Sequence, residues 1–245
     1  MGHELAHEAY LEAVGREARR LSDASAGRLE AGVPSCPDWT VEDLVEHLGN
    51  VFAFWCVQVV SADPDERHQQ AGASPGRDGL LAWLEERADE LVEGLRAAGP
   101  EAPCWNWSGR DLSSAWVGRR MALEAAVHRY DGELAAGDPT SVEADLAVDG
   151  LDERINVHLA TDVPDAPEAT LGGSLCLSCS DADAAFVVEV GRGRLHVREG
   201  AGPASAFVRG SASDLFLFSW NRVPLEALDV TGDREVAAAW STLPV

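Results

Sequence analysis

Positively charged residues are scarce in this chain. Its 245 residues include 42 Asp or Glu but only 19 Lys or Arg, which gives a formal net charge of -23. No run of Lys or Arg is long enough to form the basic surface that binds nucleic acids or anionic membranes. We therefore expect neither as a partner.

Long apolar runs and paired cysteines are also missing. The sequence has no stretch of about 18 consecutive apolar residues, and its polar start lacks the apolar core of a signal peptide. Its 5 cysteines, an odd number scattered over a long chain, differ from the dense pairing of small secreted domains. These absences predict a cytoplasmic protein with reduced thiols.

The first part of the chain follows a helical period. The apolar residues of the first expected helix recur with 3-4-3 spacing, as Leu11, Val14, Ala18 and Leu21. Three further helices are expected at residues 40–60, 80–99 and 113–137, and Thr40 is expected to cap the second of them after a loop at 33–39. Four helices with short or moderate links predict a bundle over residues 1–140.

Beyond residue 140 the pattern changes. A helix over 142–160 is followed by short runs rich in strand-forming residues, with two more helical segments near 213–221 and 233–240. The expected strands are residues 170–178, 185–190, 195–199, 205–209 and 228–231. The pattern predicts a separate α+β domain over residues 141–245.

Three side chains of the helical part form a candidate metal site. Glu124 and His128 are four residues apart on one helix, so both project from the same side. His47 falls on the apolar face of the second helix, facing the interior. Two imidazoles and a carboxylate leave a divalent ion with an open coordination position, as in catalytic zinc sites. Without a metal, the same residues would be a hydrogen-bonded buried histidine and a solvated glutamate.

Other motifs in the sequence are weaker candidates than this triad. The segment from His3 to His7 matches the H-E-x-x-H pattern of zinc peptidases, but it opens the chain, where termini fray. Cys176 and Cys179 form a C-x-x-C motif in an expected strand, where residues three apart face opposite sides. Packing roles are favoured for these cysteines and also for two further candidate nucleophiles, Cys36 and Cys104.

Two stretches carry a family resemblance. Residues 33–44 read VPSCPDWTVEDL and lead into His47, and residues 120–131 read RMALEAAVHRYD. These motifs resemble those of the mycothiol-dependent maleylpyruvate isomerase family, which belongs to the DinB-like four-helix metalloproteins. The stretch at 214–222, together with 228–233, is similar to the closing motif of that family.

The resemblance implies a two-domain α + α/β fold. A DinB-like metal-binding four-helix bundle would cover residues 1–140, and an α+β domain of sterol-carrier-like type would cover 141–245. By this resemblance, His47, Glu124 and His128 match the family's zinc ligands. Arg222 corresponds to the family's C-terminal arginine and is a candidate catalytic residue. The open alternatives for Arg222 are binding of an anionic substrate and a structural ion pair.

The function that the resemblance implies uses zinc and a low-molecular-weight thiol, mycothiol. The thiolate held by zinc adds to a cis double bond of a small electrophile, permits rotation and leaves, so the enzyme would be an isomerase. Thiol S-transferases also occur in the family. Two alternatives stay open: a metal-dependent hydrolase using bound water, and a non-catalytic protein that binds a small molecule or confers resistance. We expect a monomer or homodimer.

Overall fold

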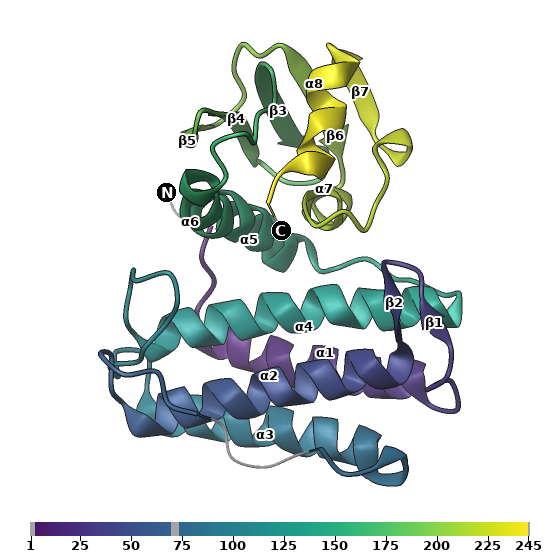
Figure 1. The fold of residues 1–245 in the computed structure, drawn as a ribbon, viewed down its shortest axis with the longest axis vertical. Helices are drawn as coiled ribbons and strands as arrows, with labels where there is room; N and C mark the ends of the chain where they lie inside the picture. Colours follow the sequence, from purple (N-terminus) through teal and green to yellow (C-terminus); the bar gives the residue numbers. More distant parts are fainter. Residues whose placement is uncertain (1–2, 70–73, 245) are drawn as a thin grey trace. The chain divides into compact units, whose positions relative to one another are not determined.

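The computed structural model describes residues 3–69 and 74–244, and the chain falls into two compact units (Figure 1). One unit is Leu5–Thr140, and the other is Ser141–Val245 with Met1–Glu4. We call them the helical unit and the sheet unit, and describe each by itself.

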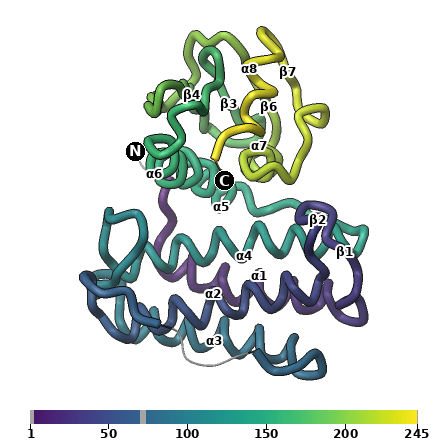
Figure 2. The backbone as a smooth tube through the Cα atoms, in the orientation of Figure 1, coloured from purple at the N-terminus to yellow at the C-terminus, as the bar shows by residue number. Residues whose placement is uncertain are grey.

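Four long helices make up most of the helical unit, and Figure 2 traces their path: α1 (His7–Ser25), α2 (Val41–Ser61), α3 (Leu80–Ala98) and α4 (Ser114–Ala136). A short 3-10 turn, η1 (Arg77–Gly79), precedes α3. α1 packs against α4 and α3, while α2 packs against α3 and α4. The predicted stripe of α1 is buried in this core. These helices begin and end close to the predicted positions because their caps are local signals.

The segment before α2 is a short hairpin rather than the predicted loop. β1 (Gly32–Val33) pairs antiparallel with β2 (Cys36–Thr40). The last strand residue, Thr40, caps α2: its Oγ1 accepts a hydrogen bond from the backbone N of Asp43, whose carboxylate accepts one from the backbone N of Thr40. This capping box satisfies two backbone N–H groups at the start of α2. Strands this short have no readable period, which explains why the sequence pattern missed them.

α2 is also the most apolar long helix. Among the described residues it is the one helix long and apolar enough to cross a membrane, with a mean hydropathy of 1.3. The core helix of a folded domain passes the same test, and α2 packs along α3 and α4. Its composition is therefore only a weak indication of a membrane span.

The sheet unit opens with a helical segment of changing pitch. α5 (Ala144–Glu153) continues into a π-helical segment, η2 (Arg154–Leu159), then into α6 (Ala160–Asp162) and η3 (Val163–Asp165). A helical segment is thus present close to the predicted range 142–160, but part of it has π-helical pitch. The pitch changes at Arg154, whose buried guanidinium lies 4.6 Å from the ring centre of Trp220.

A five-stranded sheet follows, in the order β5-β4-β3-β6-β7. Its strands are β3 (Ser174–Cys179), β4 (Ala185–Gly191), β5 (Arg194–Glu199), β6 (Ala206–Gly210) and β7 (Asp229–Gly232). β3 and β6 run parallel and the other neighbours antiparallel. The remaining elements are α7 (Ala212–Ser219), η4 (Leu225–Ala227), α8 (Arg234–Ala238) and η5 (Ala239–Thr242). The protein therefore mixes helices and sheet, with a helical N-terminal region.

Candidate metal centre

The structure brings together all three predicted metal ligands. His47 comes from α2, while Glu124 and His128 come from α4, and one donor atom from each lies within 4.8 Å of the other two. Nε2 of His128 lies 3.2 Å from Oε1 of Glu124, and Nε2 of His47 lies 3.5 Å from the same oxygen. Both imidazoles thus direct Nε2 toward one carboxylate oxygen.

The opposite edge of the His128 ring is also held by a carboxylate. Its Nδ1 lies 3.0 Å from Oδ2 of Asp131, whose side chain is completely buried. Oγ of Ser35, in the hairpin turn, donates to Oδ1 of Asp131 at 2.5 Å. This pairing favours a proton on Nδ1 and directs Nε2 toward Glu124 and His47. Burial opposes charging of His128, but Glu124 and Asp131 outweigh it and raise the pKa of His128 to about 9.

Glu124 is held by a second, cationic neighbour. The guanidinium of Arg120, one helical turn earlier, donates to Oε2 of Glu124 at 2.5 Å, and its side chain is only 5% exposed. Desolvation opposes ionisation of Glu124, yet Arg120 and then His128 hold the pKa of Glu124 well below its usual range. Glu124 is therefore a carboxylate with one oxygen on Arg120 and the other facing the histidines.

An aromatic side chain from the hairpin flanks the cluster. The ring centre of Trp39, in β2, lies 4.9 Å from that of His47 and 6.3 Å from that of His128. The hairpin therefore contributes to the centre twice, through Ser35 behind His128 and through Trp39 beside both rings. His47 is the most open ligand, with 35% of its side chain exposed.

This donor set fits a divalent metal ion. Two imidazole Nε2 atoms and one carboxylate oxygen converge, and zinc in proteins commonly takes histidine nitrogen and carboxylate oxygen. The bond between His128 and Asp131 is the arrangement found behind metal-bound histidines. The geometry supports a His2Glu site with one partly exposed side.

The other metal motif does not assemble. α1 begins at His7, so His3 lies outside the helix and the spacing of the H-E-x-x-H pattern no longer places its two histidines on one face. His3 and His7 also fall in different units. The ring of His3 instead packs edge-on against Phe186, 5.7 Å away.

A second group of potential ligands follows α2. Donor atoms of Asp63, Glu66 and His68 lie within 4.8 Å of one another. Glu66 is exposed, and Oδ1 of Asp63 already accepts a hydrogen bond from the backbone N of Asp65. Exposed acidic clusters are common without a bound ion, and we assign no function to this one.

The remaining candidates lie elsewhere. Burial raises the pKa of Cys104 to about 11 and that of Cys179 also to about 11, so neither is a ready nucleophile at neutral pH. All 5 cysteines are free in the structure. In the sheet unit, the half-buried Arg222 follows α7, and its guanidinium donates to the backbone carbonyl of Trp220 at 2.7 Å.

Sequence reasoning missed three contributors to the centre. Arg120 stands four residues before Glu124, so the same spacing rule that linked Glu124 to His128 could have found it. Ser35 and Trp39 reach the centre only through the hairpin, and nothing in their local pattern predicts that contact.

Comparison with known proteins identifies the family. The family model described as "Mycothiol maleylpyruvate isomerase N-terminal domain" matches residues 10–132, just over half of the 245 residues. These residues hold α2, the hairpin and all of the metal-centre side chains. The chain belongs to the mycothiol maleylpyruvate isomerase N-terminal domain family.

Other comparisons are weaker. No curated protein matches the chain. A solved double mutant of the sec-alkyl sulfatase PisA1 aligns at 15% identity and a TM-score of 0.30, over 95% of this chain and 32% of that one. The stereoselective inverting sec-alkylsulfatase Pisa1 from Pseudomonas sp. aligns at 12% identity and a TM-score of 0.29, over 83% of this chain and 30% of that one. The chain thus spans about a third of the length of these structures, and at such scores the likeness carries no argument.

Proposed function

We propose that the protein is a zinc-dependent enzyme that uses a low-molecular-weight thiol, mycothiol, to isomerise or S-conjugate a small electrophile such as an unsaturated organic acid. The observation that supports this most is the convergence of His47, Glu124 and His128 within a chain of the mycothiol maleylpyruvate isomerase family. The three side chains would hold the ion. A divalent ion bound there would supply Lewis acidity and lower the pKa of a thiol.

The chain's own residues support the use of an anionic thiolate. Asp131 orients His128, and Arg120 neutralises much of the charge of Glu124, so the ligand set itself contributes little negative charge. Such a site favours an anion beside the ion more than a site with an unpaired carboxylate does. Trp39 borders the centre, where it can exclude water from the reacting groups.

The proposed isomerisation needs no net redox change. The thiolate forms an S–C bond with one carbon of a cis double bond, and the electron pair moves onto the adjoining enolate system. Rotation about the resulting single bond and cleavage of the same S–C bond return the thiolate and the trans product. In an S-conjugation, the enolate carbon instead takes up one proton, which replaces the proton released when the thiol ionised, and the S–C bond is kept. We further propose that Arg222 binds a carboxylate of the substrate, a role suggested by the family's C-terminal arginine.

The test combines metal analysis with turnover. Zinc-loaded protein is mixed with mycothiol and maleylpyruvate, with and without the thiol, and conversion is followed by absorbance and by loss of free thiol. His128→Ala should lose both stoichiometric zinc and activity, whereas His3→Ala, which alters only the unassembled motif, should keep both. Full zinc occupancy in His128→Ala would refute the ligand assignment. Turnover without thiol would instead support a hydrolase, and tight binding without turnover would support a binding protein.

A further inference from the structure

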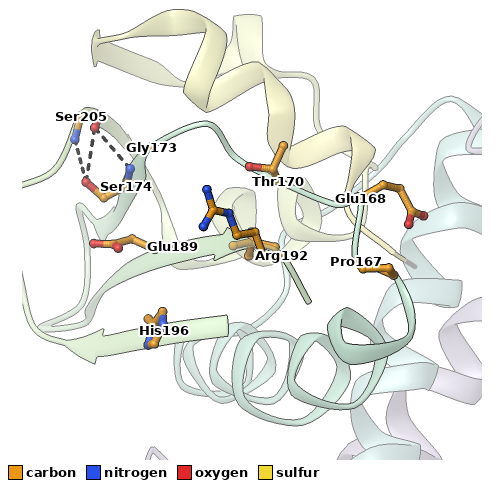
Figure 3. Close-up of a pocket in the computed structure, with 11 residues that line it drawn as sticks. Pro167, Glu168, Thr170, Gly173, Ser174, Glu189, Arg192, His196 and Ser205 are labelled. Carbon is orange, nitrogen blue, oxygen red and sulfur yellow. Dashed lines mark hydrogen bonds between the residues drawn. The ribbon is translucent and has the colours of Figure 1, made fainter. Parts of the chain in front are cut away.

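The sheet unit contains a cavity of its own. Its volume is about 680 Å³, within the usual range for small-molecule pockets, and it opens over one end of β3, β4 and β5 beside the segment from Pro167 to Gly173 (Figure 3). Every residue that lines it lies between 167 and 205. The cavity is therefore formed by residues of the sheet unit alone.

Strand pairing places a row of polar side chains along the cavity. Glu189 on β4 is directly opposite Ser174 on β3 and His196 on β5, so all three project from one face of the sheet. Ser205, just before β6, is joined to this row: its backbone N donates to Oγ of Ser174 at 3.0 Å, and the backbone N of Ser174 donates to Oγ of Ser205 at 3.3 Å. One wall thus offers a carboxylate, an imidazole and two hydroxyls.

The turn between β4 and β5 places a positively charged side chain, that of Arg192, in the lining of the cavity. Arg192 and Gly193 form the two-residue connection between β4 and β5, with φ values of 55° and 67°. Glycine or asparagine normally fills the first of these positions, because a left-handed backbone costs other residues about 1 kcal/mol. Figure 3 shows the guanidinium of Arg192 directed toward the strand ends with Ser174 and Glu189, whereas Glu168 points away.

The two opposite charges do not neutralise each other. Over residues 3–69 and 74–244, the side chains of Arg192 and Glu189 form no ion pair or hydrogen bond. Both are exposed and both line the same cavity. A cavity lined by an unpaired guanidinium and an unpaired carboxylate is complementary to a ligand that carries both charges.

We propose that this cavity binds a small zwitterion of the amino-acid type. Its carboxylate would lie on Arg192, and its ammonium group on Glu189, with the hydroxyls of Ser174 and Ser205 completing the polar contacts. The net charge of -23 favours a ligand of this kind over a simple anion, because a neutral zwitterion meets no long-range repulsion. Exposed charge pairs contribute modestly, so we expect a dissociation constant of about 1 mM or somewhat tighter.

The probe is L-glutamine, titrated into the full-length protein and followed by backbone amide NMR. Acetate and ethylamine, each with one of the two charges, are titrated alongside. L-glutamine should shift amides around Ser174, Glu189–His196 and Ser205 in a saturable way, and should bind about tenfold more tightly than either single-charge probe. Absence of saturation at about 20 mM L-glutamine would overturn the proposal. So would acetate that binds as tightly, since it would reveal an anion site only.

Two variants test the charges without disturbing the sheet. Arg192→Gly removes the guanidinium and suits the left-handed turn, so it should fold at least as well as the parent. Glu189→Gln removes the carboxylate charge at nearly constant size. Each should weaken L-glutamine binding about tenfold, while Arg209→Gln, an exposed arginine on β6 outside the cavity, should leave it unchanged. Equal binding in Arg192→Gly and the parent would overturn the assignment.

Discussion

His128 and Asp131 form a buried pair on one turn of α4, with Nδ1 of the imidazole 3.0 Å from Oδ2 of the carboxylate. The Asp131 side chain has no exposed surface and receives a second hydrogen bond from Ser35. The pair determines which nitrogen of His128 faces Glu124 and His47. The orientation of His128 therefore depends, through Asp131, on Ser35 in the hairpin before α2, which lies 96 positions before Asp131 in the chain.

The first prediction concerns this pair. Asp131→Asn keeps the size of the side chain but removes the charge that orients His128 and increases its basicity, so zinc affinity should fall about 10- to 100-fold. Competition with a chromophoric chelator measures the change. Asp138→Asn, at an exposed position after α4, is the control and should bind zinc like the parent. An unchanged affinity in Asp131→Asn would mean that the aspartate has no part in the centre.

Helix boundaries were predictable because their signals are local. Thr40 with Asp43 marks the start of α2, and Gly99 and Gly137 mark the ends of α3 and α4. Gly137 takes a φ of 83°, a conformation that glycine adopts without strain. The finer prediction of a DinB-like four-helix bundle beside a sterol-carrier-like domain, with the boundary at residue 140, stays a proposal.

The candidate site was predictable only in part. Helical spacing alone places Glu124 and His128 on one side of α4, and the apolar register of α2 turns His47 inward. Ser35 and Trp39 arrive through a hairpin whose strands are too short to show a period. The polar wall of the cavity in the sheet unit could not be predicted either, because the row of Ser174, Glu189 and His196 depends on strand register.

The second prediction concerns Arg120. Its guanidinium donates a hydrogen bond to one oxygen of Glu124 and places a positive charge close to the proposed ion. Arg120→Gln should therefore tighten zinc binding, by about tenfold, while it weakens binding of the thiolate. Chelator competition and thiol titration measure the two effects separately. Arg96→Gln, which removes an exposed arginine of α3, is the control for lost charge and should change neither.

Weaker zinc binding in a folded Arg120→Gln protein would reverse this interpretation. It would show that Arg120 acts chiefly by holding the Glu124 carboxylate in position. Thermal unfolding of the variant distinguishes that result from a general loss of structure, because the side chain is nearly buried.

The third prediction compares two helical glycines. A Cβ atom on Gly49 in α2 would lie 2.1 Å from a ring carbon of Trp83 in α3, so Gly49→Ala should cost about 1–3 kcal/mol of stability. On Gly94 in α3 the nearest atom would be Sγ of Cys56 at 3.7 Å, an ordinary contact. Gly94→Ala should thus stabilise the protein by about 0.5–1 kcal/mol. Urea unfolding measures both, and equal effects would contradict the close packing of α2 on α3.

The last prediction uses the buried ion pair at the end of α4. Nη1 of Arg129, which is fully buried, donates to Oε2 of Glu133 at 2.8 Å, and the backbone N and Oγ1 of Thr140 donate to the same oxygen at 2.8 and 2.6 Å. Burial opposes ionisation of Glu133, but the hydrogen bonds from Thr140 and the charge of Arg129 outweigh it. They lower the pKa of Glu133 below 4.5.

A carboxyl with a lowered folded-state pKa stabilises the protein above its unfolded-state pKa, and the contribution is lost as the pH falls through the folded-state value. Glu133→Gln cannot ionise and should cost about 1–3 kcal/mol at neutral pH. The difference in the free energy of unfolding between Glu133→Gln and the parent should then become smaller as the pH falls below 4.5. Urea unfolding of both proteins across this range tests it, with the exposed Glu86→Gln as a control that should show no such convergence. A difference that stays constant down to about pH 3 would show that the Glu133 charge does not stabilise the fold.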